Sequence, residues 1–137
     1  MEVRLDGRTA LITGGSLGLG KAMAMMFAES GAKVAIVARR QDVLDETKKE
    51  IEAATGGAVG AYSCNVLEKS EIEAAHAAAV KDLGPIDILI NNVGNRDINV
   101  PIAEESLADW QAMMDLNVTS CFVTTKIVGG AMLERGQ

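Results

Sequence analysis

Short apolar runs alternate with longer amphipathic or apolar segments along the chain. The runs predict strands over Thr9–Thr13, Lys33–Ala38, Ala58–Ser63 and Asp87–Asn91. Three of them contain nearly uninterrupted apolar cores (ALI, VAIVA and IDILI), which is typical of strands covered on both faces of a parallel sheet. The segments between them have helical periodicity. They predict helices over Gly18–Ser30, Asp42–Ala54, Ser70–Leu83, and Leu107 to about Glu134.

Alternation of strand and helix predicts parallel strands joined by right-handed crossovers. We therefore expect a single α/β domain over residues 1–137, a Rossmann-type doubly wound sheet with strand order 3-2-1-4. Ser70 and Glu73 form an S-x-x-E pattern, which predicts a capping box at the start of the third helix.

Composition and charge narrow the function. The net charge is −6, which disfavours a nucleic-acid partner. The N-terminus, MEVRLDGR, is charged and has no apolar run of the secretory type, and the longest continuous apolar run, Ala22 to Ala28, is too short for a bilayer. We therefore expect a cytoplasmic protein without a membrane partner. Cys64 and Cys121 lack a C-x-x-C pattern and are expected to be free, and the lone His76 has no ligand cluster that predicts a metal site.

The stretch TGGSLGLG, Thr13 to Gly20, follows the first predicted strand and opens the first helix. A turn that binds phosphate must bring backbone N–H groups close to the anion and aim a helix N-terminus at it. Glycines at 14, 18 and 20 meet both needs, in the spacing G-x-x-x-G-x-G. The alternative is a tight strand–helix turn with no ligand.

Four motifs in order resemble the short-chain dehydrogenase/reductase family. Thr13–Gly20 is similar to its T-G-x-x-x-G-x-G turn, and Asn91–Gly94 is similar to its N-N-A-G motif with Val for Ala. Cys64-Asn65-Val66 resembles its D-V pair with Asn for Asp, and Asp115–Val118 resembles its D-x-N-V segment. The resemblance covers Leu5 to Gly136. It implies an NAD(P)-dependent oxidoreductase that interconverts a carbonyl and an alcohol by hydride transfer.

The resemblance also assigns cofactor contacts. Between Gly14 and Gly20 of the motif, the residues that would wrap the pyrophosphate and adenosine ribose are Ser16, Leu17, Gly18 and Leu19. Asn65 and Val66 would contact the adenine, with the Asn65 side-chain oxygen accepting from the adenine amino group. Asn91, Val93 and Gly94 would line the adenine-ribose side, and Thr13 would tie the first strand to the fourth.

The end of the second predicted strand bears on cofactor choice. An acidic residue there binds the ribose of NAD, whereas a nearby arginine accommodates the 2′-phosphate of NADP. This chain has Ala38 in that place, followed by Arg39 and Arg40, so we predict NADP(H) in preference to NAD(H). The alternative is that both arginines are solvated charges flanking a helix. Leu17 lacks the basic side chain that many NADP-preferring relatives carry.

The catalytic residues of the family are Asn, Ser, Tyr and Lys, and Asn117 matches the Asn that holds a water in the proton relay. The only tyrosine, Tyr62, has Val66 four residues later, so the chain has no Y-x-x-x-K. By resemblance, the Ser, Tyr and Lys would come after Gln137. We therefore expect a Rossmann domain incomplete at its C-terminus. The alternative is a non-catalytic dinucleotide-binding fragment or pseudoenzyme that binds cofactor or a partner chain.

Two further expectations concern partners. The predicted helix at 107–134 is apolar on more than one face, which favours a homo-oligomer formed through it. Arg96 and Asp97, directly after N-N-V-G-N, are candidates to face a small-molecule carbonyl or alcohol substrate. Family members with N-V-G-N-R at this place include sugar-acid and polyol dehydrogenases.

Overall fold

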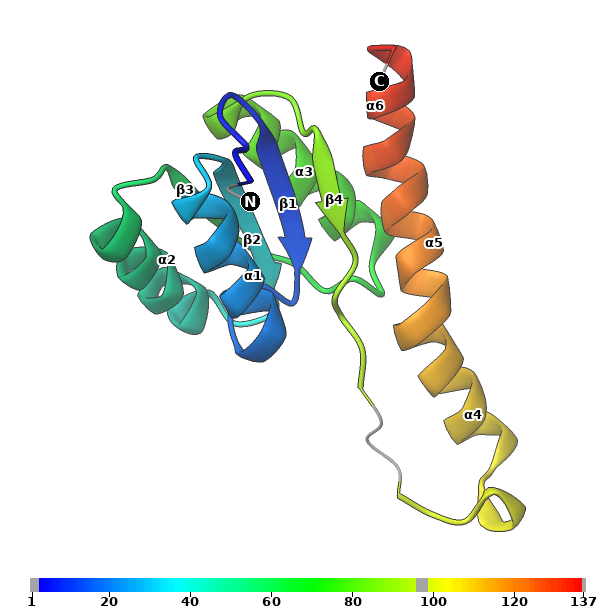
Figure 1. The fold of residues 1–137 in the computed structure, drawn as a ribbon. Helices are drawn as coiled ribbons and strands as arrows, with labels where there is room; N and C mark the ends of the chain where they lie inside the picture. The colour runs from blue at the N-terminus through cyan, green and yellow to red at the C-terminus, as the bar shows by residue number, and fades with distance from the viewer. Residues whose placement is uncertain (1–2, 96–98, 137) are drawn as a thin grey trace.

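The computed structural model describes residues 3–95 and 99–136. Four parallel strands form one sheet in the order β3-β2-β1-β4 (Figure 1). The strands are β1 (Thr9–Thr13), β2 (Lys33–Ala38), β3 (Val59–Ser63) and β4 (Ile88–Ile90). The predicted fold class and strand order are confirmed. Arg96 and Asp97, the candidate substrate-facing residues, lie outside the described residues.

Helices cover both faces of the sheet. They are α1 (Gly18–Glu29), α2 (Gln41–Thr55), α3 (Lys69–Leu83) and a long helix over 107–134. Ile12, Val34 and Ile36 pack against α1 and α2, whereas Leu11 and Val37 pack on the opposite face against α3 and the long helix. Neighbouring strand residues thus point to opposite, equally covered faces, which is why the strands are apolar throughout.

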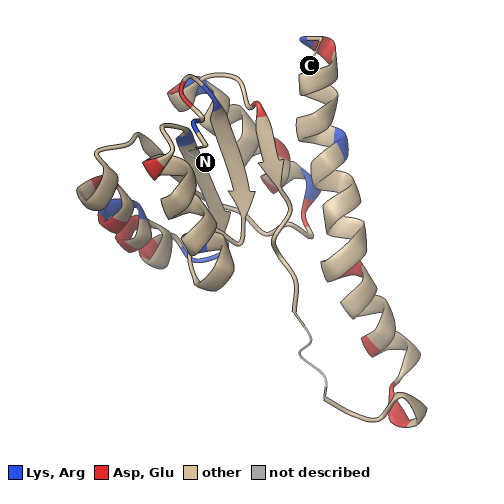
Figure 2. Ribbon diagram, in the orientation of Figure 1, with Lys and Arg blue, Asp and Glu red and all other residues tan. Residues whose placement is uncertain are grey.

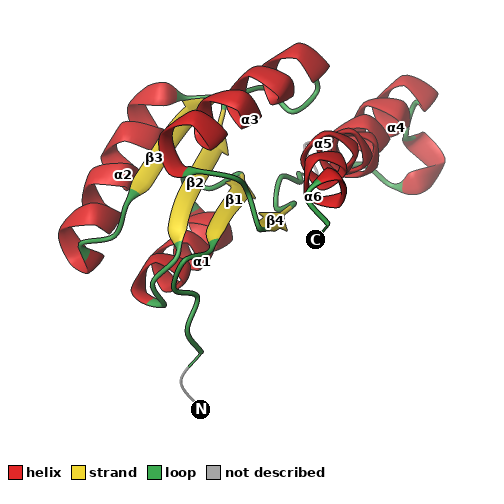
Figure 3. Cartoon of the chain, turned by 90° about the horizontal axis from the view of Figure 1, so that it is seen from above, coloured by secondary structure: helices red, strands yellow, loops and turns green. Residues whose placement is uncertain are grey.

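The long helix lies beyond β4 at the edge of the sheet (Figures 1 and 3). Its consecutive segments are α4 (Leu107–Met114), η2 (Asp115–Thr119), α5 (Ser120–Thr124), η3 (Thr125–Gly129) and α6 (Gly130–Glu134), and η1 (Ile102–Glu104) precedes it. The sequence predicts one helix here, but not that η2 and η3 are π-helical turns. Ser106 caps its start by accepting a hydrogen bond from the Asp109 N–H at 3.1 Å.

One face of the long helix packs on the domain and another faces outward. Ser120, Thr124 and Val128 are buried, whereas Phe122 and Leu133 are 65% and 75% exposed. Figure 2 shows charged residues gathered on α2 and few along the long helix. Leu107–Glu134 is long and apolar enough to cross a membrane by length and composition, with 17% of its most apolar window buried. Core helices of soluble proteins meet the same criteria, and this helix contacts both α3 and β4.

The predicted capping box at the start of α3 is wrong. The helix begins at Lys69 with Glu68 as its N-cap, and no side chain caps it. Glu71 accepts the Asn65 N–H at 2.6 Å, and Glu73 pairs with Lys69 at 3.1 Å. The Glu71 carboxylate in the first turn of the helix therefore holds the loop before it. This contact takes the place of the predicted capping box between Ser70 and Glu73.

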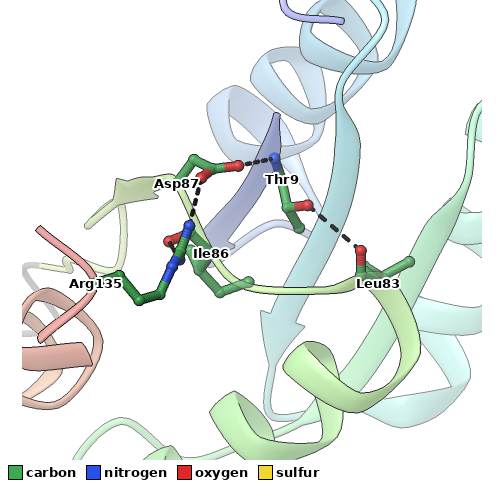
Figure 4. Close-up of polar contacts among 5 residues, drawn as sticks. All are labelled: Thr9, Leu83, Ile86, Asp87 and Arg135. Carbon is green, nitrogen blue, oxygen red and sulfur yellow. Dashed lines mark hydrogen bonds and ion pairs between the residues drawn. The ribbon is translucent and has the colours of Figure 1, made fainter. Parts of the chain in front are cut away.

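A polar cluster ties the C-terminal end of the long helix to the sheet (Figure 4). Asp87 accepts from the Thr9 N–H at 2.8 Å and from Arg135 Nη2 at 2.9 Å. Arg135 Nη1 also donates to the Ile86 carbonyl at 2.9 Å, and Thr9 Oγ1 donates to the Leu83 carbonyl at 3.5 Å. One carboxylate, 10% exposed, thus connects the starts of β1 and β4 to the helix.

Replacing Asp87 by alanine should lower the free energy of unfolding by about 1–2 kcal/mol, because the buried Thr9 N–H loses its acceptor. Urea denaturation followed by circular dichroism measures this. Glu73→Ala is the matched control, since its ion pair with Lys69 is half exposed and such pairs contribute about 0–1 kcal/mol. Equal losses in the two variants would show that the Asp87 cluster does not fasten the helix.

Candidate functional site

A pocket of about 620 Å³ opens at the carboxyl ends of the strands, where ligands bind in open α/β sheets. The turn after β1, the ends of β2 and β3, the segment after β4 and the long helix all contribute to it. Of the predicted cofactor residues, its lining includes Gly14, Ser16, Leu17, Arg39, Arg40, Asn65, Val66, Val93 and Gly94. The topology therefore brings together residues from four separate parts of the chain.

Other predicted residues do not line this pocket in the described part of the chain. Gly18, Leu19 and Gly20 form the first turn of α1, and Asn91 donates from Nδ2 to Thr125 Oγ1 at 3.0 Å. Several lining residues were not predicted from the sequence as site residues: Val43, Cys64, Leu67, Asn92, Asn95, Ala112 and Leu116. Of these, Asn92 had a signal, because it lies inside the N-N-V-G motif.

The glycines of the turn are required by its geometry. Gly14 and Gly18 have φ values of +64° and +54°, in the left-handed region that favours glycine. A Cβ on Gly20 would lie 2.0 Å from the Gly14 carbonyl oxygen and 2.6 Å from Asn92 Nδ2. Helix α1 therefore starts in direct contact with the turn, and only a glycine fits at position 20.

Side chains from two other elements hold carbonyl groups of this turn. Asn92 Nδ2 donates to the Gly14 carbonyl at 3.2 Å, and Thr47 Oγ1 donates to the Ser16 carbonyl at 2.8 Å. The first N–H groups of a helix have no intrahelical partner, and the N-cap of α1, Leu17, has no side chain that caps them. Donor groups at a helix N-terminus beside a glycine turn fit a phosphate group.

The two arginines after β2 differ in their surroundings. Arg40 donates to Asp42, with Nη2 2.6 Å from Oδ2, which lowers the pKa of the Asp42 carboxyl and raises that of the guanidinium. The Arg39 side chain is exposed and forms no ion pair with any residue that the structure describes. Its carbonyl accepts from Ser63 Oγ at 2.9 Å, which fixes its backbone at the mouth of the pocket. Of the pair, Arg39 has the guanidinium available for a ligand.

The candidate adenine contact is already engaged by the protein. Asn65 Oδ1 accepts from the Leu67 N–H at 3.1 Å, an Asx-turn that shapes the segment after β3. An amide oxygen has a second lone pair, so this bond leaves one acceptor position. The neighbouring Cys64 is buried, and burial raises its pKa to about 11, so it is a thiol at neutral pH. Both cysteines are free, as predicted.

Asn117 lies in the π-helical turn η2 and binds the segment after β4. Its Oδ1 accepts from the Asn95 N–H at 3.1 Å, and its Nδ2 donates to the carbonyls of Asn95 and Met113, both at 2.8 Å. A Cβ on Gly94 would lie 2.8 Å from this oxygen. π-turns inside helices are frequent at functional sites. The side chain of Asn117 therefore positions the backbone that follows the N-N-V-G motif.

Two other residues have clear structural roles. Thr13 Oγ1 donates to the Ile90 carbonyl and accepts from the Asn92 N–H at 3.0 Å, which confirms that it ties β1 to β4. The Tyr62 hydroxyl donates to Asp82 Oδ2 at 2.9 Å, between β3 and α3. Burial and this carboxylate raise the pKa of Tyr62 above its ordinary value, so it is poorly suited to acid–base chemistry.

Comparison with known proteins agrees with this architecture. A model of the short chain dehydrogenase family matches residues 8–137. D-threitol dehydrogenase of Mycolicibacterium smegmatis is 36% identical, over 98% of this chain and 51% of its own length. 2-Dehydro-3-deoxy-D-gluconate 5-dehydrogenase of Formosa agariphila is 38% identical, over 96% of this chain and 49% of its own.

A solved structure gives the same picture. L-Sorbose reductase from Gluconobacter frateurii, complexed with NADPH and L-sorbose, superimposes with a TM-score of 0.90 at 31% identity. The match covers 99% of this chain and 51% of the reductase. The chain thus spans about half the length of the relatives that it matches. With its strand order, glycine turn and match over residues 8–137, this chain belongs to the short chain dehydrogenase family of oxidoreductases.

Proposed function

We propose that the protein binds NADP(H) in the pocket at the carboxyl ends of the strands and acts as an oxidoreductase that interconverts a carbonyl and an alcohol. The observation that carries the proposal is the juxtaposition around one pocket of a glycine turn, a helix N-terminus and Arg39, which forms no ion pair with a described residue. A dinucleotide with an extra phosphate on its ribose needs these groups at its two phosphate positions. The NADPH in the L-sorbose reductase complex supports this choice of cofactor.

Each part of the pocket has a defined task in this proposal. The turn from Gly14 to Gly20 binds the pyrophosphate and adenosine ribose, with Ser16, Leu17, Gly18 and Leu19 around them. Arg39 binds the 2′-phosphate, while Arg40 remains paired with Asp42. Asn65 and Val66 contact the adenine, and Val93 and Gly94 form the opposite wall toward the ribose. Asn91, next to them in the chain, stays a predicted ribose contact, although it donates to Thr125 and lies outside the described lining of the pocket.

When bound, the cofactor supplies the hydride. The chain's own contribution to the reaction is to hold the dinucleotide and to fix the backbone beside it. Asn117, our candidate catalytic residue, binds Asn95 and thereby fixes the segment after Gly94 at the pocket wall. Its role in a proton relay remains a prediction from the family resemblance.

A second candidate function is dinucleotide binding without catalysis. It is favoured by the only tyrosine, Tyr62, which bonds to Asp82 and has no lysine four residues later. A general acid must reach the reacting oxygen. The described residues that line the pocket include neither a tyrosine nor a lysine. In this reading the 137-residue chain binds cofactor, or a partner chain, and does not reduce carbonyls.

Binding and turnover of the same preparation separate the two functions. NADPH fluorescence titration measures binding, and loss of absorbance at the reduced nicotinamide band with a ketose or a keto sugar acid measures turnover. Binding with turnover supports the oxidoreductase, and binding without turnover supports the non-catalytic function. Absence of NADPH binding contradicts both the oxidoreductase and the dinucleotide-binding function, and leaves only the binding of a partner chain.

The names of two relatives guide the choice of substrates. D-threitol and 2-dehydro-3-deoxy-D-gluconate are substrates by the names of those proteins, so we propose a polyol or a sugar acid as the substrate here.

We also propose a homo-oligomer through the outward face of the long helix, where Val118, Phe122 and Leu133 are at least half exposed. Burial of this face between copies is consistent with a cytoplasmic protein. A monomeric mass by analytical ultracentrifugation would contradict it.

A further inference from the structure

A polar side chain interrupts the buried face of α2. Leu44 and Ile51 on this face are fully buried in the core, and Thr47 between them is 2% exposed. A valine has the same shape, so packing alone does not require the hydroxyl of Thr47. Burying a hydroxyl is unfavourable unless it makes a hydrogen bond. The partner of Thr47 therefore indicates what the hydroxyl does.

That partner lies outside the helix. A threonine hydroxyl in a helix commonly bonds to the carbonyl four residues earlier, and Thr55 of the same helix does so, with Oγ1 2.8 Å from the Ile51 oxygen. Thr47 Oγ1 instead donates to the Ser16 carbonyl at 2.8 Å, in the glycine turn. The helix that follows Arg39 and Arg40 thus holds the turn that we assign to the phosphates.

This contact orients a donor of the pocket. Peptide groups are planar and trans, so a carbonyl and the following N–H point in opposite directions. With the Ser16 oxygen held by Thr47, the Leu17 N–H is directed away from α2. Ser16 and Leu17 both line the pocket. The bond therefore fixes the direction of a backbone donor between two residues that line the pocket.

The turn needs such a constraint. Gly14 and Gly18, with positive φ, flank this segment, and glycines leave the backbone free to rotate. Other hydrogen bonds hold the ends of this segment: the Gly15 N–H donates to the Val37 carbonyl at 3.3 Å, the Lys21 N–H donates to the Leu17 carbonyl at 3.2 Å, and Asn92 Nδ2 donates to the Gly14 carbonyl at 3.2 Å. None of these three bonds is made to the Ser16–Leu17 peptide group.

We propose that Thr47 is a positioning residue for dinucleotide binding: its hydroxyl locks the Ser16–Leu17 peptide with the N–H toward the pocket. This inference rests on the proposed function, because it concerns affinity for the same cofactor. Thr47 itself is not among the described residues that line the pocket. Its hydroxyl removes the cost of ordering the turn when the phosphate binds.

The test compares four variants by NADPH titration, at a temperature where circular dichroism shows each to be folded. Thr47→Val keeps the shape and removes the hydroxyl, and Thr47→Ala removes it without any steric demand. Both should raise the Kd for NADPH about fivefold to tenfold, as expected for one lost hydrogen bond. Thr47→Ser retains a hydroxyl and should stay within about twofold of the wild type.

Thr55→Val is the matched control, because it removes a threonine hydroxyl from the same helix outside the pocket. It should lower thermal stability and leave the Kd unchanged, which separates positioning from stability. If the wild type binds NADPH and Thr47→Val and Thr47→Ala bind it equally well, the inference is wrong and the proposed function stands. Thr47→Ser as weak as Thr47→Val would also overturn it. If the wild type binds no NADPH, both are overturned.

Discussion

Gly20→Ala should abolish NADPH binding and destabilise the fold. The added Cβ would lie 2.0 Å from the Gly14 carbonyl oxygen, and real Cβ atoms do not approach backbone this closely. Helix α1 must therefore move away from the turn, which displaces the N–H groups assigned to the phosphates. Overpacking of this kind costs about 3 kcal/mol, and the contact with backbone leaves no side chain that can yield. Urea denaturation and NADPH titration measure the two effects.

Gly130→Ala is the matched control for this substitution. Gly130 also lies in a helix, but a Cβ there would meet nothing within 4 Å. Alanine is favoured over glycine in helices by about 1 kcal/mol, so this variant should be as stable as the wild type or more so, with unchanged affinity. If Gly20→Ala behaves like Gly130→Ala, close contact between α1 and the turn is not what the glycine provides.

Arg39→Ala should lower the affinity for NADPH by about 10- to 100-fold and leave that for NADH nearly unchanged. A hydrogen bond to a charged group contributes about 1.5–3 kcal/mol, and only NADPH carries the 2′-phosphate. In the proposed site, Ala38 stands where a carboxylate would bind the NADH ribose, so we expect the wild type to bind NADH weakly. Titration with each cofactor at low and high salt measures the preference, which should weaken as salt screens the phosphate.

Arg40→Ala tests the assignment within the pair. Its guanidinium is bound to Asp42, so the substitution should change the NADPH affinity less than about threefold. A larger loss from Arg40→Ala than from Arg39→Ala would mean that the phosphate displaces Asp42. Equal losses for NADPH and NADH in Arg39→Ala would contradict a role in cofactor choice.

The fold follows from the sequence because its signals are local and repeated. Runs such as VAIVA in β2, short and rich in β-branched residues, are typical of a strand covered on both faces, and the helices between such runs favour parallel pairing. The glycine turn could also be predicted, because glycine is the residue that most readily adopts the positive φ found at Gly14 and Gly18. Periodicity also predicts the long helix, but it says nothing of the π-helical turns inside it.

Contacts between residues far apart in the chain could not be predicted from the sequence. Thr47 appears in the pattern as one residue of an apolar stripe, and only the packing of α2 beside the turn brings it to the Ser16 carbonyl. Asn117 matches a family motif, but its bonds to Asn95 depend on where the loop after β4 returns. By contrast, the ion pair between Arg40 and Asp42 had a local signal in the sequence, because the two residues are only two positions apart. This signal distinguishes Arg40 from Arg39.

Isothermal titration calorimetry of the wild-type chain with NADPH and with NADH measures whether the pocket binds a dinucleotide and which one it prefers. We expect one NADPH per chain, bound at least tenfold more tightly than NADH, because the turn and Arg39 each bind a phosphate of the former and only the turn binds one of the latter. Absence of heat with either cofactor at two temperatures, in a preparation that circular dichroism shows to be folded, would contradict a dinucleotide site at the carboxyl ends of these strands.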